Sequence, residues 1–160
     1  MSAPALLGLH HFKLPVSDLD ASIDWYGKVF DAEYLPQFDH VDSGGVRYAV
    51  ILNVPGLPAP VELRWAPEVA AAIHGYDPID LAVDSVDALN AWVAHLDTLD
   101  VDHSEVISGG AGHLMVLADP DGIFIRVAEV PAGGVDDIQM PDGDPEADIY
   151  WLKPPSMQHP

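Results

Sequence analysis

Apolar and polar residues alternate along residues 7–16, as they do in a strand with one buried face. The alternation predicts one face with Leu9, His11 and Lys13 and an opposite face with His10, Phe12 and Leu14. Residues 18–30 carry apolar side chains at helical spacing, and we expect Ser17 to cap this helix. Three more strands are expected, at 33–39, 45–54 and 61–66, separated by turn segments. The first part of the chain therefore has the order βαβββ.

The same order of elements occurs again 67 residues later. Residues 9–26 align without a gap on residues 76–93, with five identities in eighteen positions. The identical pairs are Leu14 and Leu81, Val16 and Val83, Asp20 and Asp87, Ala21 and Ala88, and Trp25 and Trp92. Because unrelated segments of this length share about one residue by chance, we expect a duplicated module.

The second copy continues with a predicted helix at 85–98 and predicted strands at 102–107, 112–118 and 122–130. Asp119-Pro120-Asp121-Gly122 is typical of a hairpin turn. In the last strand, alternation places Phe124, Arg126 and Ala128 on one face. We therefore expect an α+β domain built from two modules, 7–66 and 76–130, followed by a tail at 131–160.

Charge and composition limit the classes of partner. The chain has 160 residues, of which 26 are Asp or Glu and only 6 are Lys or Arg, giving a formal net charge of −20. This balance argues against binding of nucleic acid or of an anionic membrane surface. No apolar run is long enough to span a membrane and no signal-peptide pattern is present, so we expect a cytoplasmic protein. The absence of cysteine excludes disulfides, thiolate nucleophiles and zinc-thiolate sites.

The tail has two interpretations. Residues 131–148 are rich in Pro, Gly and acidic residues, a composition that buries little apolar surface. Residues 149–152, however, are four large apolar residues, Ile-Tyr-Trp-Leu. The segment is either a frayed end or a strap that docks Tyr150 and Trp151 on the body of the protein, on a partner subunit or over a cleft.

Two fused βαβββ modules, with HHFKLPVSDLDASIDWY at 10–26 and DPDGIFI at 119–125, resemble the vicinal-oxygen-chelate superfamily. This superfamily includes glyoxalase I, extradiol dioxygenases, fosfomycin-resistance enzymes and bleomycin-binding proteins. The resemblance covers about residues 7–130. It implies that each module forms half of a glyoxalase-like barrel and that the paired halves form a cleft. It also implies a homodimer, and a divalent metal ion in those members that are metal enzymes.

The residues at the family's metal positions are only partly metal ligands. The resemblance places His11 and Glu62 at two ligand positions, whereas Pro78 and Arg126 stand at the other two. Proline has no ligating side chain, and arginine is a permanent cation. Since catalytic metal sites usually keep three protein ligands, we expect no metal cofactor. A divalent ion held by His11, Glu62 and further histidines is the alternative.

Alternation places more charged side chains on the face of His11 and Glu62. These are Lys13, Arg47, Arg64 and, in the second module, Asp80 and Arg126. Four of the six cations are thus expected to line one concavity, with Phe124 as apolar wall. Buried cations need anions beside them. These anions are either internal, with Arg126 pairing Glu62 and Lys13 pairing Asp80, or belong to a ligand carboxylate, phosphate or phenolate.

Three functions are compatible with these residues. The first is a metal-independent binder of a small acidic or aromatic metabolite. The second is a glyoxalase-like lyase or isomerase, or a dioxygenase-type enzyme, acting on a vicinal-oxygen or enolisable substrate. In that enzyme His11 is the base, Glu62 orients it, and Arg126 or an atypical metal stabilises the oxyanion. The third is an interaction module whose charges are all paired internally.

Overall fold

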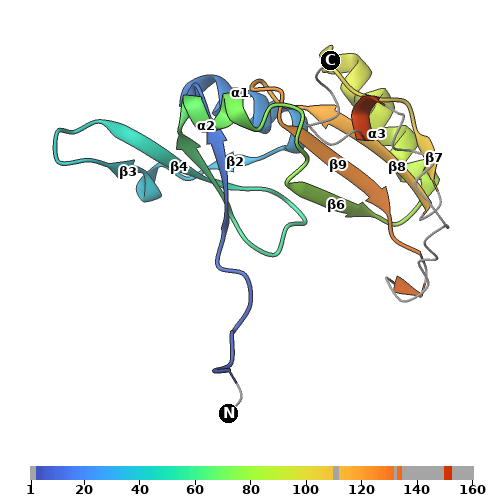
Figure 1. Cartoon of the computed structure of the whole chain (residues 1–160), viewed down its shortest axis with the longest axis horizontal. Coiled ribbons are helices and arrows are strands. Elements are labelled where there is room, and N and C mark those ends of the chain that lie inside the picture. The colour runs from blue at the N-terminus through green and yellow to red at the C-terminus, as the bar shows by residue number, and fades with distance from the viewer. Residues whose placement is uncertain (1–2, 110–111, 132, 135–149, 153–160) are drawn as a thin grey trace. The chain divides into compact units, whose positions relative to one another are not determined.

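The computed structural model describes residues 3–109, 112–131, 133–134 and 150–152. The chain divides into two compact units, Met1–Ala70 and Ala71–Pro160. Each unit contains one sheet and one long helix (Figure 1). Across the described ranges, no helix has the length and apolar character needed to cross a bilayer.

The first unit has the expected βαβββ order with short additions. Its elements are β1 (Phe12–Val16), α1 (Leu19–Phe30), β2 (Glu33–Tyr34), the 3₁₀ turn η1 (Pro36–Phe38), β3 (His40–Val41), β4 (Arg47–Asn53) and β5 (Val61–Trp65). The sheet order is β1-β5-β4-β2, and β3 also pairs with β4. β1 runs parallel to β5, and the other pairs are antiparallel.

One face of this sheet packs against α1. The helix is amphipathic and buries Leu19, Tyr26, Val29 and Phe30. On the sheet, Leu63 of β5 lies between Leu14 of β1 and Val50 of β4, and all three side chains are buried. Because side chains alternate along a strand, the neighbouring residues of β5 point away from α1.

The second unit repeats this arrangement. It contains β6 (Ile79–Val83), α3 (Val86–Leu99), β7 (Ile107–Gly109), β8 (Gly112–Ala118), β9 (Phe124–Glu129) and the 3₁₀ turn η3 (Tyr150–Leu152), while α2 (Pro67–Ala72) spans the boundary between the units. The sheet order is β6-β9-β8-β7, with β6 parallel to β9. β1 and β6 begin 67 residues apart, as do α1 and α3. The two βαβββ modules predicted from the sequence are therefore confirmed.

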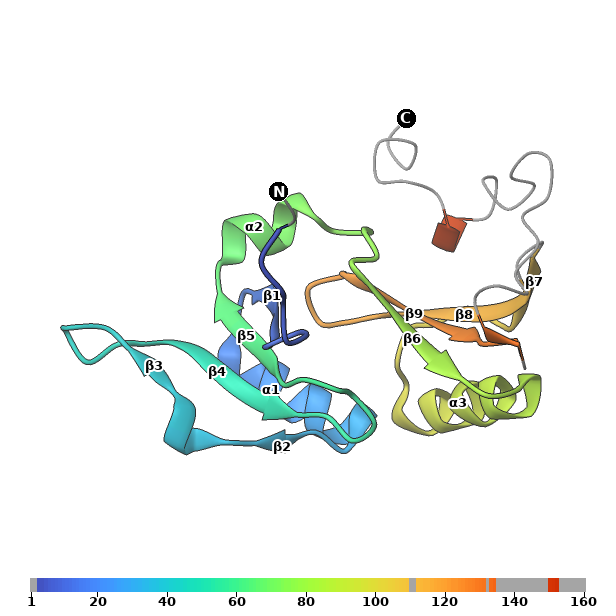
Figure 2. The ribbon, with the colours of Figure 1, turned by 90° about the horizontal axis from the view of Figure 1, so that it is seen from below.

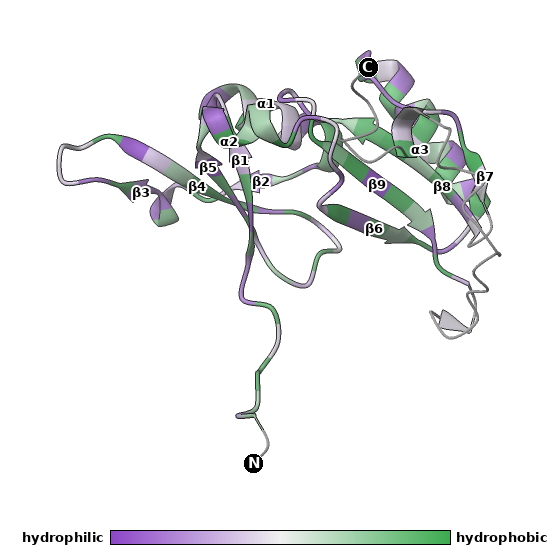
Figure 3. Ribbon diagram, viewed as in Figure 1, coloured by the Kyte–Doolittle hydropathy of each residue, from purple (hydrophilic) through white to green (hydrophobic). Residues whose placement is uncertain are grey.

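The two faces of the second sheet have different covers. α3 lies against β8 and β9 on one face, and η3 lies on the other (Figure 2). Figure 3 shows that β8 and β9 are largely hydrophobic along their length. Leu114, Val116 and Phe124 form a buried cluster, against which Trp151 and Leu152 of η3 pack. Of the two interpretations of the tail, docking on the body of the protein applies to Trp151.

β1 is shorter than the expected strand 7–16, because its partner strand cannot extend further. β5 begins at Val61, and the preceding Pro58 and Pro60 have no backbone N–H to donate. The backbone bond from Phe12 N to Pro60 O, at 3.3 Å, lies at this end of the pair. Figure 1 shows the chain before β1 as an extended segment that leaves the sheet.

Several other predicted boundaries were wrong by a few residues. The expected strand 33–39 ends at Tyr34, because η1 begins at Pro36, and the expected strand 102–107 begins only at Ile107. α2 was not predicted. The cap of α1 is Asp18, not Ser17, because one oxygen of the Asp18 carboxylate accepts hydrogen bonds from the backbone N of Asp20 and Ala21 at 3.0 Å each.

Candidate functional site

Glu62, in the middle of β5, is the centre of the candidate site. Its side chain is fully buried, and it lies on the face of the sheet opposite to α1. Its direct neighbours across the sheet are Lys13 on β1 and Ile51 on β4. Directly paired residues point to the same side of a sheet, so β1 and β5 bring Lys13 and Glu62 together.

Three basic side chains surround the Glu62 carboxylate. Arg64 donates to Oε1 from Nε at 2.8 Å and from Nη2 at 2.6 Å. The Nζ of Lys13 lies 3.2 Å from Oε2, and the Nε2 of His11 lies 3.1 Å from the same oxygen. The expectation that alternation puts His11, Lys13, Glu62 and Arg64 on one face agrees with this placement.

The environment keeps Glu62 ionised. Burial raises the pKa of a carboxyl, but here the hydrogen bonds and charges of Arg64 and Lys13 outweigh it, so the pKa of Glu62 is lowered. One carboxylate thus faces two basic side chains, Lys13 and Arg64. The Lys13 side chain is 49% exposed and that of Arg64 is 40% exposed, so the excess positive charge is accessible to a ligand.

His11 has a neighbour at each ring nitrogen. Its Nδ1 lies 2.6 Å from Nδ1 of His10, and its Nε2 faces Glu62. Nε2 and the facing Oε2 are both buried and have no aligned hydrogen bond within the described structure. We expected His10 to face the helix layer, but it is exposed, because β1 begins only at Phe12 and the alternation does not extend to residue 10.

The donor set does not fit a divalent ion. The family resemblance implies His11 and Glu62 as ligands, but Lys13 and Arg64 already contact both oxygens of that carboxylate. Fixed positive charges at this distance repel a metal cation. Within the described ranges, no group of three or more His, Cys, Asp or Glu residues is arranged to hold a metal.

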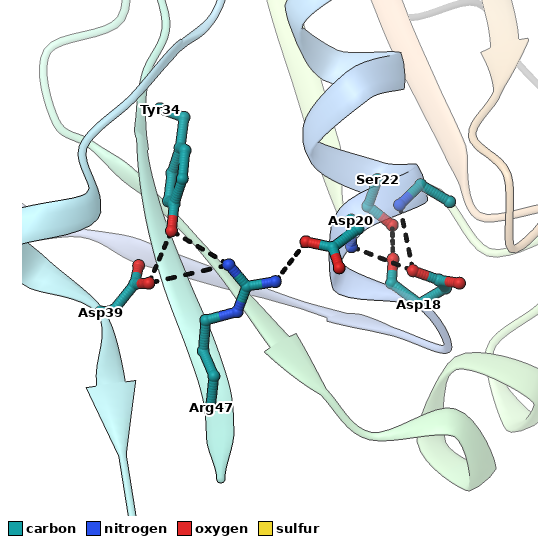
Figure 4. A network of polar contacts seen from close by, with 7 residues as sticks. Asp18, Asp20, Ser22, Tyr34, Asp39 and Arg47 are labelled. Carbon is teal, nitrogen blue, oxygen red and sulfur yellow. Dashed lines mark hydrogen bonds and ion pairs between the residues drawn. The ribbon is translucent and has the colours of Figure 1, made fainter. Parts of the chain in front are cut away.

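Arg47 lies in a separate network (Figure 4). Its guanidinium pairs with Asp20 of α1, donates to Tyr34 Oη at 3.1 Å and lies 3.8 Å from Asp39 Oδ2. Tyr34 in turn donates to Asp39 at 2.5 Å, and burial together with this bond raises the pKa of Tyr34. Arg47 is the first residue of β4, beside a register shift in the pairing with β3. Its charge is matched by two carboxylates.

Arg126 and Asp80 lie in the second unit. They are paired positions on β9 and β6, and Arg126 also forms an ion pair with Asp77. Burial raises the pKa of Asp80, and the charge of Asp77 adds to this rise, which outweighs the lowering by Arg126. Phe124, on the same strand face as Arg126, is buried against Trp151. Arg126 is therefore a cation beside two acidic groups.

Each of the other histidines in the described part of the chain has a neighbouring partner. His113 lies 2.9 Å from Glu129, His103 lies 3.3 Å from Asp97, and His74 contacts the Asp121 carbonyl oxygen at 3.2 Å. His40 and His95 make ring contacts with Tyr48 and Trp92.

Sequence reasoning missed two contacts of the site. Asp77, the partner of Arg126, precedes β6, where strand alternation assigns no face. Ala49 is the cross-strand partner of Arg64, so alternation along β4 puts its neighbour Tyr48 on the other face, but the Arg64 guanidinium lies 5.5 Å from the Tyr48 ring centroid. The length of the arginine side chain accounts for this second contact.

Comparisons with known proteins agree with the fold. The sequence model of the Glyoxalase/Bleomycin resistance protein/Dioxygenase superfamily matches residues 8–127. An antibiotic-binding protein from Streptomyces sp. CB03234, TnmS3, is 23% identical, with a TM-score of 0.62 and coverage of 79% of this chain and 98% of its own. No curated protein sequence matches the chain.

A fosfomycin resistance protein and a lyase are also similar in structure. The fosfomycin resistance protein FosX from Listeria monocytogenes is 16% identical, with a TM-score of 0.60 and coverage of 80% of this chain and 94% of its own. A mutant of FosX has been solved with Mn(II) and 1S,2S-dihydroxypropylphosphonic acid. Lactoylglutathione lyase from Agrobacterium tumefaciens is 17% identical, with a TM-score of 0.57 and coverage of 79% and 96%.

Proposed function

We propose that this chain, which belongs to the Glyoxalase/Bleomycin resistance protein/Dioxygenase superfamily, is a metal-independent binder of a small acidic or aromatic metabolite. The observation that carries the proposal is the buried Glu62, which holds the partly exposed cations of Lys13 and Arg64 at one position of the sheet. A pre-positioned pair of cations with one excess charge suits an anionic group.

The geometry of Arg64 supports a carboxylate, phosphate or phenolate as that group. Arg64 uses Nε and Nη2 for Glu62, and within the described ranges Nη1 makes no hydrogen bond. A ligand oxygen can therefore accept from Arg64 without displacing Glu62. The Tyr48 ring beside the guanidinium adds an aromatic surface. The antibiotic-binding relative from Streptomyces supports a small-molecule ligand in general.

The short distance between His11 and Glu62 favours a second candidate, an enzyme in which His11 is the base and Glu62 orients it. Two contacts favour the binder instead. His10 lies against the other ring nitrogen of His11, and the Glu62 carboxylate already forms ion pairs with Lys13 and Arg64. A base needs one ring nitrogen free to accept a proton.

Location and assembly complete the proposal. The cytoplasmic location expected from the sequence is part of this proposal. The superfamily resemblance supports a homodimer.

The test is a ligand screen in the presence of EDTA. A panel of aromatic carboxylates, phosphonates and phenols is examined by thermal shift, and each hit is titrated by calorimetry. We expect Arg64→Gln and Lys13→Gln each to weaken binding by about 10-fold to 100-fold, the value of a lost charged hydrogen bond. Lys28→Gln, which changes an exposed cation at the end of α1, is the matched control and should bind normally.

Metal dependence separates the two candidate functions. Near-stoichiometric nickel, zinc, manganese or iron in the purified protein, or binding that disappears in EDTA, contradicts the metal-independent binder. Equal affinity of the wild type and the Arg64 variant contradicts the assigned role of the cations.

A further inference from the structure

The chain's own C-terminal segment covers an apolar surface of the second unit. Leu114, Val116 and Phe124 lie on the face of the sheet opposite to α3, and Trp151 and Leu152 of η3 pack on them. The ring centroids of Trp151 and Phe124 are 5.0 Å apart, with an angle of 43° between the ring planes. An aromatic ring therefore already occupies this surface.

The turn η3 differs from α3, the helix that covers the opposite face of the same sheet. α3 has fourteen residues and buries Leu89 and Leu96 as part of the repeated module. η3 is a single turn of three residues outside that module. A single turn outside the repeated module, which packs on the cluster through Trp151 and Leu152, can leave the surface at a lower free-energy cost than a helix of the core.

We propose that Leu114, Val116 and Phe124 form the binding surface for the planar ring of an aromatic ligand, and that Trp151 is a built-in competitor for this surface. The inference rests on the proposed function, because it takes the aromatic class of metabolite named there and assigns it a surface within the second unit. Phe124 supplies the ring for stacking, and Leu114 and Val116 supply the flat apolar surround.

The spacing of the two rings decides between competition and a sandwich. A ligand ring between two others needs about 7 Å between them, which is twice the ordinary carbon contact distance. At 5.0 Å, Trp151 and Phe124 are in direct contact. The ligand ring must therefore displace the indole before it can reach Phe124.

The test is a fluorescence titration of the full-length protein with 8-anilinonaphthalene-1-sulfonate, an aromatic anion. Removal of the competitor in Trp151→Ala should tighten binding by about threefold to tenfold, the factor expected if one aromatic pair holds the segment in place. Trp92→Ala, on α3, is the matched control and should bind like the wild type. Adding Phe124→Leu to Trp151→Ala should reverse the gain, because the ring is lost while the apolar volume is largely kept.

Equal thermal unfolding temperatures of wild type and Trp151→Ala establish that the dye reports a site rather than a loosened fold. Unchanged binding in Trp151→Ala overturns the proposal, and weaker binding overturns it in favour of Trp151 as part of the ligand site. The proposed function is judged separately, by the response to Arg64→Gln in EDTA. Tighter dye binding without an Arg64 effect would leave the aromatic surface standing and remove the anionic site.

Discussion

Glu62 is tolerated inside the sheet because its charge is matched on both oxygens. An ionised carboxylate without partners costs several kcal/mol to bury, and Arg64, Lys13 and His11 surround this one at 2.6 to 3.2 Å. The side chains of Lys13 and Arg64 remain partly exposed to solvent. The carboxylate therefore fixes their positions, while the cations stay available for a second anion.

Replacement of the carboxylate should destabilise the fold at neutral pH. Glu62→Gln removes the charge that Lys13 and Arg64 share, and we expect the free energy of unfolding to fall by about 1–2 kcal/mol. This figure is below the usual cost of breaking a buried pair, because both cations remain partly solvated. Urea unfolding at pH 7 measures the change. Glu33→Gln, at an exposed position on β2, is the control and should be nearly neutral.

The difference in the free energy of unfolding between wild type and Glu62→Gln should depend on pH. The pKa of Glu62 is lowered in the folded state from 4.5, so the unfolded chain binds the proton first. The stabilisation is present above about pH 4.5 and is lost as the pH falls through the lower folded pKa. The difference between wild type and Glu62→Gln should therefore shrink below about pH 4. A difference that is equal at pH 7 and pH 3 would show that the ion pairs are not its source.

Much of the candidate site could be predicted from single residues and alternation. His11, Lys13, Glu62 and Arg64 come together because parallel pairing of β1 and β5 keeps the faces that alternation assigns. The position of Arg47 could not be predicted, because its partner Asp20 lies on a helix and the register of β3 shifts beside it. A long side chain at the end of a strand can pair with any anion within its length. The alternation of the strand does not predict which anion that is.

At the scale of elements, an alternating segment forms a strand only where a neighbouring strand can pair with it. Residues 7–11 alternate as well as residues 12–16 do, yet only the latter pair with β5, because prolines precede Val61. The helix caps show the same dependence on geometry. Ser17 and Asp18 are both good cap residues, and the structure selects Asp18 by its backbone conformation, with φ −141° and ψ 114°.

The turn between β8 and β9 is predicted well because its chemistry is local. The Asp119 carboxylate accepts from the backbone N of Asp121 and Ile123, both at 2.9 Å. Gly122 has a φ of +72°, where a residue with a Cβ is strained. A Cβ at Gly122 would also overlap the His74 imidazole.

Gly122→Ala should therefore lower the free energy of unfolding by about 1–2 kcal/mol from backbone strain, with a further cost from His74. The His74→Ala background separates the two causes, because it removes the overlap and leaves the strain. We expect Gly122→Ala to cost less in that background than in the wild type, as measured by urea unfolding of all four proteins. Equal costs in both backgrounds would show that His74 moves aside freely.

At the scale of the whole molecule, the duplication was the most informative signal. Five identities at a shift of 67 residues predicted two equivalent sheets, and the strand orders of the two units are equivalent. The chemistry of the two copies has diverged. Glu62 of the first unit has basic neighbours, whereas Arg126 of the second has acidic ones. A repeat therefore predicts topology, which depends on apolar periodicity, better than it predicts charge.

Net charge opposes the proposed homodimer, and exposed leucines favour it. Each copy carries −20, and like charges repel over roughly 10 Å at 0.1 M salt. Leu6, Leu7 and Leu9, in the extended segment before β1, are exposed to 92%, 108% and 56%. Three exposed leucines within four residues are unusual on the surface of a monomer and support the proposed contact with another copy.

The expected result is a dimer whose stability increases with salt. Light scattering after size exclusion should give twice the 17.2 kDa chain mass in 0.5 M NaCl, and a larger monomer fraction in 0.02 M NaCl at the same protein concentration, because screening weakens the repulsion. Replacing Leu6, Leu7 and Leu9 by serine should increase the monomer fraction at both salt concentrations. Val69→Ser, which changes an exposed apolar residue of α2, is the control. A monomer at both salt concentrations contradicts the homodimer, and a dimer unaffected by the serine variant places the contact elsewhere than at the leucines.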